Sequence, residues 1–405
     1  MIYVHIPFCH SKCYYCGFYS LASLARKEAF LDALRKETQL RSGYLEGLEH
    51  DSLYFGGGTP SILQATELES ILTHLERFYK LSPDAERTIE INPDDININI
   101  GVNKSTHRST TESVDIGVDK GIHKSAEAKH TLSLSCLREM GFNRLSIGVQ
   151  SFNDAVLKTI NRTHTAEQAL NAVKLAADLG FDNISIDLLI GLPNYTVTEL
   201  ERDIHIALSL PVSHISFYML SIEQGSVFAK KQEKGSFQTA DDDLLADCYL
   251  KCSAILSDNG FEHYEISNFA KDNKYSRQNT GYWQQKSYIG FGPSAHSYRQ
   301  TERQWNIANV NTYIESIEQG KLPFEQEYLT ERELYNEYIM TSLRTIWGAD
   351  LRLLNGRFAQ FWAKNTQYMD EMLNKGLAQI QNSKIVLNTK GWLISDILFS
   401  ELFAD

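Results

Sequence analysis

The sequence predicts an α/β protein in which a partial (β/α)6 barrel precedes a small C-terminal α+β domain of winged-helix-like type. Two observations carry this prediction. Short apolar segments alternate with amphipathic helical segments over residues 1–228, which indicates a parallel sheet. From about residue 330 the pattern changes to helices and one short hairpin. Six βα units are too few for a closed eight-stranded barrel, so we expect an open one, capped by a linking region at 229–329.

Composition places the chain among ordinary globular proteins. Its 405 residues are 42% hydrophobic, which is enough for a sizeable core. The formal net charge of -12 disfavours nucleic acid as a partner, because no basic excess is present to neutralise phosphates. The sequence shows no signal peptide and no apolar run of about twenty residues. We therefore expect a cytoplasmic protein whose association with membranes is at most peripheral.

The first strand is predicted at residues 1–6, where β-branched residues are frequent and Pro7 ends the run. Cys9, Cys13 and Cys16 follow on a loop, so three thiols lie within eight residues. Thiolates are soft ligands, and they select iron–sulfur clusters, zinc or copper(I). The loop is therefore a candidate metal site.

This loop supplies one ligand fewer than usual. Zinc and iron–sulfur sites normally have four protein ligands, and Phe18 stands where a fourth cysteine would come. Two interpretations stay open on these residues. One is a site with an open coordination position, and the other is a zinc site completed by His5 or His10.

A helix is predicted at 22–41 and a second strand at 51–55. Three glycines at 56–58 follow this strand directly, and Thr59 comes next. Glycines in such a turn let backbone amides approach a ligand without obstruction by Cβ, and Thr59 adds a hydroxyl. The turn is thus a candidate ligand contact.

Polar residues stand at or near the ends of the next strands, where function collects in parallel folds. Glu90 points toward the barrel mouth or is a solvated edge charge, and Gln150 ends the following strand. Asp187 lies inside an apolar run and needs a buried partner. The remaining strands of the barrel are predicted at 87–91, 144–152, 183–193 and 214–220.

Two segments between these strands stand out. Arg162 precedes a helix at 166–179, and its guanidinium either clamps a carboxylate or lies at the surface. Residues 97–129 are rich in small polar residues and cannot bury enough apolar surface to offset the entropy of ordering. We expect a mobile surface insertion or a partner-binding loop, after which a helix begins near residue 132.

The linking region contains a helix predicted at 240–259. Cys248 and Cys252 lie one turn apart on it and are interpreted as buried structural cysteines rather than metal ligands. Further along, the glycines around Phe291 and many aromatic residues suggest a tight turn beside a flat apolar cavity that suits a planar ligand. Ordinary aromatic packing would explain the same residues.

The last part of the chain is predicted to contain a helix at 331–345, a hairpin of 377–380 with 384–387, and a final helix at 389–403. This order is typical of winged-helix-like domains. Because the chain is acidic and lacks a basic recognition helix, we do not expect the domain to bind DNA.

Five passages in this order resemble one family. They are 3–9, 56–60, 144–152, 187–193 and 290–298, and they are similar to the radical S-adenosylmethionine (SAM) family of oxygen-independent coproporphyrinogen III oxidases and related HemW-type haem chaperones. The resemblance implies a [4Fe–4S] cluster on Cys9, Cys13 and Cys16, whose fourth iron takes the amino and carboxylate groups of SAM. It further implies SAM contacts from Tyr3, Tyr15, Gly57, Gly58, Thr59, Glu90, Gln150, Arg162, Asp187, Met219 and His296.

Within this family the chain resembles the haem chaperones most. The decarboxylating oxidases continue their cluster loop with a further cysteine, and here that position is Phe18. The compact length and the lack of an N-terminal extension agree with the chaperones. The resemblance implies haem and apo-haemoproteins as partners, allows a cluster-dependent dimer, and speaks against coproporphyrinogen oxidase activity. A decarboxylating oxidase or another radical SAM enzyme is the alternative.

The haem motif departs from the family pattern. The family has His-Asn-x-x-Tyr, whereas this chain has Gln278 before Asn279 and Tyr282. An amide does not replace imidazole as an axial iron ligand. The sequence therefore leaves three outcomes: ligation by His263 or His296, ligation by Tyr282, or loss of stable haem binding.

Overall fold

The computed structural model describes residues 1–96, 132–193 and 195–405, and the insertion expected at 97–129 lies outside the described residues. Its centre is a nine-stranded sheet in the order β7-β8-β6-β5-β4-β3-β2-β1-β9. Six adjacent strands run parallel and in chain order, so the expected partial barrel of six βα units is confirmed. These strands are β1 (Ile2–Ile6), β2 (Glu49–Gly57), β3 (Lys80–Ile91), β4 (Arg144–Gln150), β5 (Asn183–Ile190) and β6 (His214–Met219).

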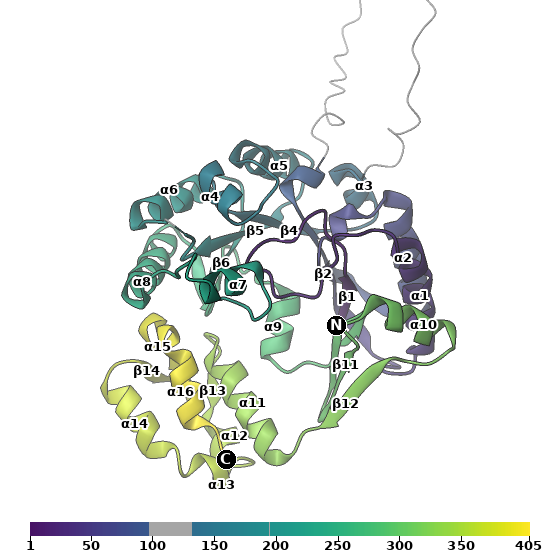
Figure 1. Cartoon of the computed structure of the whole chain (residues 1–405). Helices are drawn as coiled ribbons and strands as arrows, with labels where there is room; N and C mark the ends of the chain where they lie inside the picture. The colour runs from purple at the N-terminus through teal and green to yellow at the C-terminus, as the bar shows by residue number, and fades with distance from the viewer. Residues whose placement is uncertain (97–131, 194) are drawn as a thin grey trace, which may run out of the picture.

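Helices connect the parallel strands and lie in an arc around them (Figure 1). Parallel pairing requires such crossover connections. Two of these helices, α5 and α6, begin with a reciprocal capping box at Thr165 and Thr196. The helices are α1 (Lys27–Leu40), α2 (Ala65–Phe78), α3 (Leu134–Glu139), α4 (Asp154–Thr159), α5 (Ala166–Asp178) and α6 (Val197–Leu208).

The first helix begins five residues later than predicted. The Leu21 N–H donates to the Pro7 carbonyl at 2.8 Å, and the Leu21 carbonyl accepts from the Cys9 N–H at 2.9 Å. Residues near Leu21 are therefore tied to the cysteine loop. Because their backbone groups are used there, the helix begins only at Lys27.

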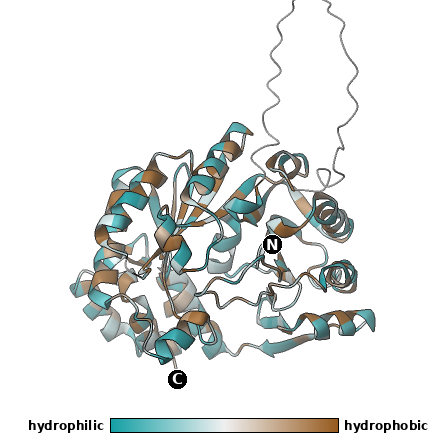
Figure 2. Ribbon diagram, turned by 45° about the horizontal axis from the view of Figure 1, so that its top comes forward, coloured by the Kyte–Doolittle hydropathy of each residue, from teal (hydrophilic) through white to brown (hydrophobic). Residues whose placement is uncertain are grey.

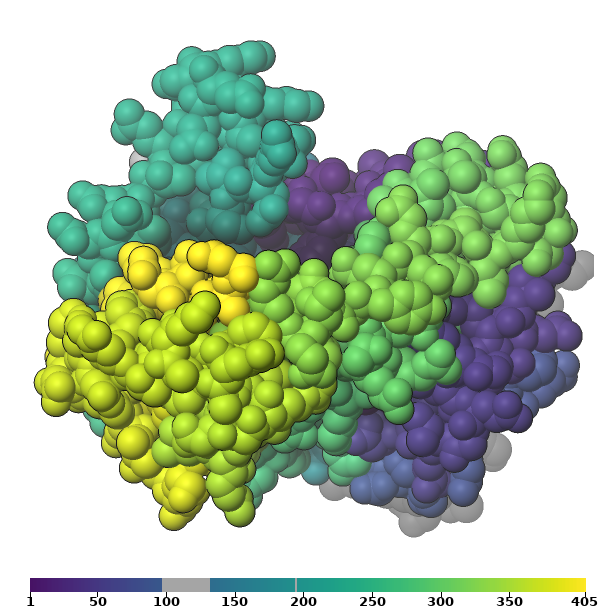
Figure 3. All heavy atoms as spheres, turned by 90° about the horizontal axis from the view of Figure 1, so that it is seen from below, coloured from purple at the N-terminus to yellow at the C-terminus, as the bar shows by residue number. Residues whose placement is uncertain are grey.

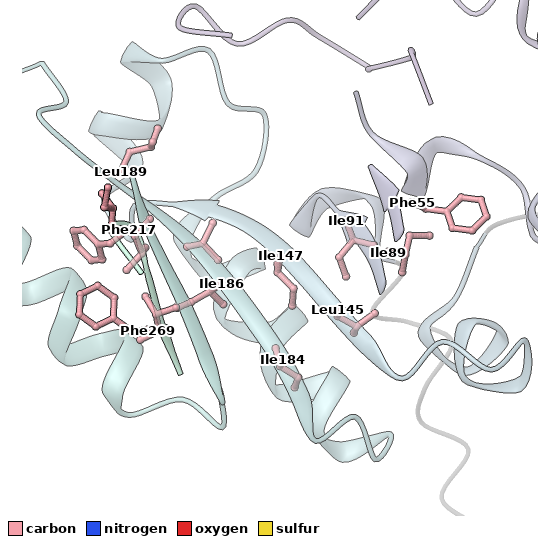
Figure 4. Packing of buried hydrophobic residues seen from close by; sticks show 14 of the residues in the cluster. Phe55, Ile89, Ile91, Leu145, Ile147, Ile184, Ile186, Leu189, Phe217 and Phe269 are labelled. Atoms are coloured by element: carbon pink, nitrogen blue, oxygen red, sulfur yellow. The ribbon is translucent and has the colours of Figure 1, made fainter. Parts of the chain in front are cut away.

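Side chains alternate between the two faces of each parallel strand. The outward residues are apolar and pack beneath the helices, as Leu145 and Ile147 of β4 and Ile184 and Ile186 of β5 show in Figure 4. The helices carry both hydrophobic and hydrophilic stretches (Figure 2), as expected of helices with one face on a core. The intervening strand residues are mostly polar: Thr88, Glu90, Ser146, Ser185, Asp187 and Ser216. Apolar side chains fill the interior of an ordinary barrel, so this polar inner face suits a binding site instead.

The linking region extends this sheet at both edges. β9 (Ile289–Phe291) pairs parallel to β1, and β8 (Asn268–Ala270) pairs antiparallel to β6, with β7 (Glu262–Glu265) beyond it. The predicted tight turn is therefore wrong for 289–291, which form a strand. A turn follows at 292–295, where Gly292 has φ +94° and a Cβ would lie 2.5 Å from the His5 carbonyl oxygen.

Other elements of the linking region lie around the sheet. Cys248 and Cys252 are both buried in the core on α8, as predicted. β10, β11 and β12 form a separate antiparallel sheet. The elements are α7 (Val227–Glu233), α8 (Asp242–Asp258), α9 (Arg277–Trp283), β10 (His296–Arg299), β11 (Glu302–Asn306), α10 (Val310–Glu318) and β12 (Phe324–Tyr328).

The C-terminal domain, yellow in Figure 1, has its own three-stranded sheet in the order β13-β15-β14. The predicted final helix is wrong in one respect, because it is broken at Ile394. In its first part, α15, the Trp392 indole N–H donates to the Leu343 carbonyl at 2.9 Å. Its second part, α16, packs on α11. The elements are α11 (Glu331–Leu343), β13 (Ala349–Asp350), α12 (Leu351–Asn355), α13 (Ala359–Trp362), α14 (Thr366–Asn374), β14 (Ala378–Gln381), β15 (Lys384–Leu387), α15 (Thr389–Leu393) and α16 (Ser395–Leu402).

Within the described ranges, no helix is both long and apolar enough to cross a membrane.

Candidate functional site

A cavity of about 620 Å³ opens beside the inner face of the barrel. Figure 3 shows a hollow with the purple N-terminal residues on its floor, bordered by teal and green segments and by the yellow C-terminal domain. The wall combines residues that follow the cysteine loop, inner-face residues of the barrel, helix α9, the β10–β11 hairpin and helix α11. Of the residues expected to bind ligands, it contains Tyr3, Glu90, Asn279, Tyr282 and His296.

The cysteine loop lies next to this cavity, since Gly17 and Phe18 line its wall. Thr59 Oγ1 donates to Cys9 Sγ at 3.5 Å, and Arg162 Nη1 donates to Cys13 Sγ at 3.6 Å. Burial raises the pKa of the Cys9 thiol, and the Thr59 hydroxyl partly offsets this. A bound cation would hold such buried sulfurs as thiolates.

The zinc alternative fits this loop poorly. His5 uses both ring nitrogens, one with the Tyr3 hydroxyl at 3.0 Å and the other with the Tyr19 carbonyl at 2.9 Å. His10 pairs with Asp95 at 2.9 Å. In the part of the chain that the structure describes, no three His, Cys, Asp or Glu side chains converge as a single ion requires.

Arg162 is not a surface residue. Its Nη2 donates to the Gly148 carbonyl at 2.5 Å and to Asn92 Oδ1 at 2.9 Å, and its buried Nε has no partner among the described residues. Gln150 lies beside it, because a Cβ on Gly148 would be 3.0 Å from both Arg162 Nη2 and Gln150 Nε2. Gln150 has a positive φ of 67°, which turns the chain at the end of β4. Tyr15 also lies near Arg162 and Cys13, and burial raises its pKa strongly.

The glycine turn meets the expectation only in part. The amide of Gly57 donates to Glu90 Oε2 at 3.2 Å, that of Gly58 to the Ile6 carbonyl at 2.8 Å, and that of Thr59 to the Phe8 carbonyl at 2.7 Å. The expectation that these amides face a ligand is therefore wrong, because the Glu90 carboxylate and the carbonyls of Ile6 and Phe8 accept their hydrogen bonds. The backbone carbonyls of this turn and the Thr59 hydroxyl remain as candidate ligand contacts. The glycines are required for close approach, since a Cβ on Gly57 would lie 2.5 Å from the His5 ring.

Glu90 is an inner-face residue, and the edge-charge alternative is wrong. Its carboxylate accepts from the Tyr54 hydroxyl at 2.8 Å and from the Gly57 amide. Burial raises its pKa to about 7, against the opposing effect of the Tyr54 hydrogen bond. Glu90 is thus a partly protonated group at neutral pH that lines the cavity.

The last two expected SAM contacts, Asp187 and Met219, lie on β5 and β6. Asp187 accepts from Ser146 Oγ at 3.4 Å, and burial raises its pKa although the Ser216 hydroxyl opposes the shift. Its buried partners are thus hydroxyls. Met219 ends β6 and is 37% exposed. Neither side chain lines the cavity.

Gln278, which stands in place of the histidine of the family's haem motif, has a structural role. Gln278 is 1% exposed, accepts from Ser52 Oγ at 2.7 Å and donates from Nε2 to the Tyr282 hydroxyl at 2.7 Å. The amide thus holds Tyr282 from within the cavity wall. The Gln278 side chain is long enough to reach both Ser52 and Tyr282.

The two histidines differ as candidate iron ligands. His263 is 8% exposed and donates or accepts through both ring nitrogens, with Ser253 at 2.9 Å and the Ile266 carbonyl at 3.1 Å. It is therefore excluded. His296 lines the cavity, and no hydrogen bond of its ring occurs in the described ranges. Burial lowers its pKa, which favours the neutral, ligating form.

Sequence reasoning missed several residues of the wall. Tyr54 and Tyr218 follow from the two-residue period, since they share the inner face with Glu90. Tyr288, Arg303 and Glu337 carry no such signal, because they come from loops and from other units of the fold.

Comparison with known proteins gives one consistent result. The sequence model of the Radical SAM superfamily matches residues 3–207. The chain is 31% identical to the heme chaperone HemW of Bacillus subtilis (strain 168), and the match covers 100% of this chain and 99% of that protein. It is 30% identical to the heme chaperone HemW of Lactococcus lactis subsp. lactis, covering 100% and 97%.

A solved structure supports the fold. The coproporphyrinogen III oxidase HemN of Escherichia coli aligns with a TM-score of 0.79 at 22% identity, covering 100% of this chain and 89% of that one. At this identity the likeness shows the fold alone.

Proposed function

Because the chain belongs to the radical SAM superfamily, and within it to the HemN-like proteins of HemW type, we propose that it is a haem chaperone. It carries a [4Fe–4S] cluster and SAM, and it transfers haem to apo-haemoproteins. The observation that carries the proposal is the aromatic cavity beside the cysteine loop. A planar, largely apolar ligand suits such walls, and the volume lies in the range of small-molecule sites.

The cluster is assigned to Cys9, Cys13 and Cys16. The donor set fits, because thiolates are the usual ligands of iron–sulfur clusters and the three sulfurs share one loop. Thr59 and Arg162 donate to two of these sulfurs, and such outer contacts orient ligands and tune a metal site. When bound, the cluster supplies single electrons to the SAM sulfonium.

SAM is assigned to the groups around this loop. Arg162 Nη2 and the Gln150 side-chain amide lie together beside Gly148, and Arg162 Nε has no partner among the described residues, so a carboxylate would find donors here. The carbonyls of Gly57 and Gly58 and the Glu90 carboxyl are acceptors that suit an ammonium group. Tyr3, Tyr15, Thr59, Asp187, Met219 and His296 complete the residues assigned to SAM by family resemblance.

Haem is the cargo, and we assign it to the aromatic cavity, next to Asn279 and Tyr282. His296 is the iron ligand in this proposal, because its ring lines the cavity and burial lowers its pKa, which favours the neutral form. In this proposal His296 takes the role of the histidine that the family has at the position of Gln278. The assignment of His296 to haem takes precedence over its less secure assignment to SAM.

The test is an anaerobic reconstitution followed by haem titration, read from absorbance. We expect the wild type to bind haem and donate it to an apo-cytochrome. His296→Ala should weaken binding by about tenfold or more, since an axial bond is lost. His205→Ala, on the exposed face of α6, is the matched control. Absence of haem uptake by the wild type would reject the proposal.

The decarboxylating alternative requires its own assay. Anaerobic incubation with reductant, SAM and coproporphyrinogen III should give no decarboxylated product, because Phe18 stands in place of the further cysteine of those enzymes. Accumulation of protoporphyrinogen would replace the chaperone proposal with that activity.

A further inference from the structure

The aromatic cavity contains a single strong cation. Its wall is mostly aromatic and polar, with the carboxyl groups of Glu90 and Glu337, and Arg303 is the only arginine or lysine among its described lining residues. Arg303 is 32% exposed and extends from β11, the strand between β10 and β12. A lone guanidinium in an otherwise aromatic wall is a specific feature, because such walls need no cation for packing.

Arg303 lies close to the proposed haem ligand. Burial lowers the pKa of His296 and the charge of Arg303 adds to this effect, whereas burial raises the pKa of Tyr288 and the charge of Arg303 opposes the rise. Tyr298, its cross-strand neighbour on β10, also lines the cavity. The periphery of a ligand bound to His296 would therefore lie close enough to Arg303 to interact with its charge.

Arg303 is also paired with two carboxylates. Nη1 donates to Glu327 Oε1 at 3.2 Å on the neighbouring strand β12. Nη2 forms an ion pair with Glu337 of helix α11, in the C-terminal domain. Glu337 lines the cavity and is 15% exposed, whereas Glu327 is 46% exposed and lies outside the wall.

The two pairs differ in what a ligand would do to them. Guanidinium binds carboxylates through parallel hydrogen bonds, and a buried carboxylate needs such a partner. A carboxylate that enters the cavity would compete with Glu337 for Nη2 and leave Glu327 in place. The Glu337 carboxylate thus occupies the position that a ligand carboxylate requires.

We propose that Arg303 binds a propionate of the porphyrin in the aromatic cavity, and that Glu337 is the internal carboxylate which this propionate displaces. This inference rests on the proposed function, since the ligand is haem. It adds a specificity residue, namely the one that distinguishes a porphyrin with free carboxylates from an esterified one. It also links the occupancy of the cavity to the contact between β11 and the C-terminal domain.

The test compares haem with haem dimethyl ester on the reconstituted protein. We expect the wild type to bind haem more tightly than the ester by about tenfold, and Arg303→Gln to lower the affinity for haem to that for the ester. Arg303→Lys should recover part of the difference between the affinities for haem and for the ester, because lysine keeps the charge but lacks the bidentate guanidinium. Glu337→Gln should tighten haem binding by roughly threefold, since the competing carboxylate is neutralised.

Glu327→Gln is the matched control, because it removes the other partner of Arg303 outside the cavity. It should leave the affinity for haem within about twofold. The ester affinity reports on folding, since every variant that keeps the cavity should bind the ester as the wild type does. If Arg303→Gln lowered the affinities for haem and for the ester equally, the inference would fail while the proposed function stood. The same holds if Arg303→Gln lowered neither affinity. If the wild type bound neither porphyrin, the proposed function itself would fail.

Discussion

The cysteine loop and the aromatic cavity share one end of the barrel but are built in opposite ways. Around the loop, Thr59 and Arg162 donate to sulfurs, and the turn amides are bonded to the protein. In the cavity wall, tyrosines and two histidines, His5 and His296, come from segments far apart in the sequence. The first region is a rigid polar network around sulfur, and the second is an aromatic space with few charges. The difference suggests two separable binding tasks.

The largest effect should follow from Cys13→Ala. Two cysteines cannot hold three corners of a cluster, so we expect almost complete loss of iron after anaerobic reconstitution. Haem affinity should change by less than about threefold, because the aromatic cavity does not depend on these sulfurs for its walls. Iron analysis and haem titration measure both. Cys248→Ala on α8 is the control and should keep its iron, and a Cys13→Ala protein with full iron would refute the cluster assignment.

Arg162→Met tests the polar region without replacing a cysteine, although it removes one hydrogen bond to Cys13 Sγ. We expect SAM affinity to fall by about 10–100-fold while most of the iron is kept, because the guanidinium orients Asn92 and Gly148 beside the ligand. Calorimetric titration with SAM measures this. Arg162→Lys should recover little, since an ammonium group cannot bridge these partners. The exposed Arg202→Met is the control, and unchanged SAM affinity in Arg162→Met would remove this residue from the site.

A double substitution tests whether the cavity accepts a second iron ligand. Gln278 lines the same wall as His296, so Gln278→His should restore about tenfold of the haem affinity that His296→Ala loses. The single Gln278→His variant should lose about 1 kcal/mol of stability, because the bond with Ser52 is disturbed. Haem titration and thermal unfolding measure the two effects. A double variant as weak as His296→Ala would place the iron away from residue 278.

The smallest effect concerns Glu90, which lies where the two regions meet. Its pKa is about 7 in the folded state and 4.5 ordinarily, so the folded protein binds this proton more tightly than the unfolded chain. The stability from this group is present at low pH and is lost as the pH rises through about 7. Glu90→Gln does not titrate. Its free energy of unfolding relative to wild type should therefore rise by on the order of 1 kcal/mol between about pH 5 and about pH 8.

Denaturant unfolding at several pH values measures this difference. Tyr54→Phe provides the comparison, because it removes a hydrogen bond to the carboxylate and should raise the Glu90 pKa further. Parallel pH profiles of wild type and Glu90→Gln would show that this carboxyl is not perturbed.

Local pattern was sufficient for much of the polar region. The spacing of Cys9, Cys13 and Cys16 and the glycine turn are enough to predict where that region lies. The position of Glu90 near a strand end left it undecided between the barrel mouth and a solvated edge charge. Local pattern could not show that the fold uses the amides of Gly57 and Gly58, because their acceptors are the Glu90 carboxylate on β3 and the Ile6 carbonyl on β1. It also left Arg162 undecided between surface and site, since burial depends on what packs around a side chain.

The amino-acid sequence by itself determined the parallel barrel, the cysteine loop and the family, because these follow from periodicity and short spacings along the chain. The aromatic cavity was decided only by tertiary structure. His296, Arg303 and Glu337 lie on β10, β11 and α11, and nothing in their local sequence relates them. They meet because the strands after the barrel and the C-terminal domain pack beside its open end, and contacts between distant segments exist only once the chain is folded.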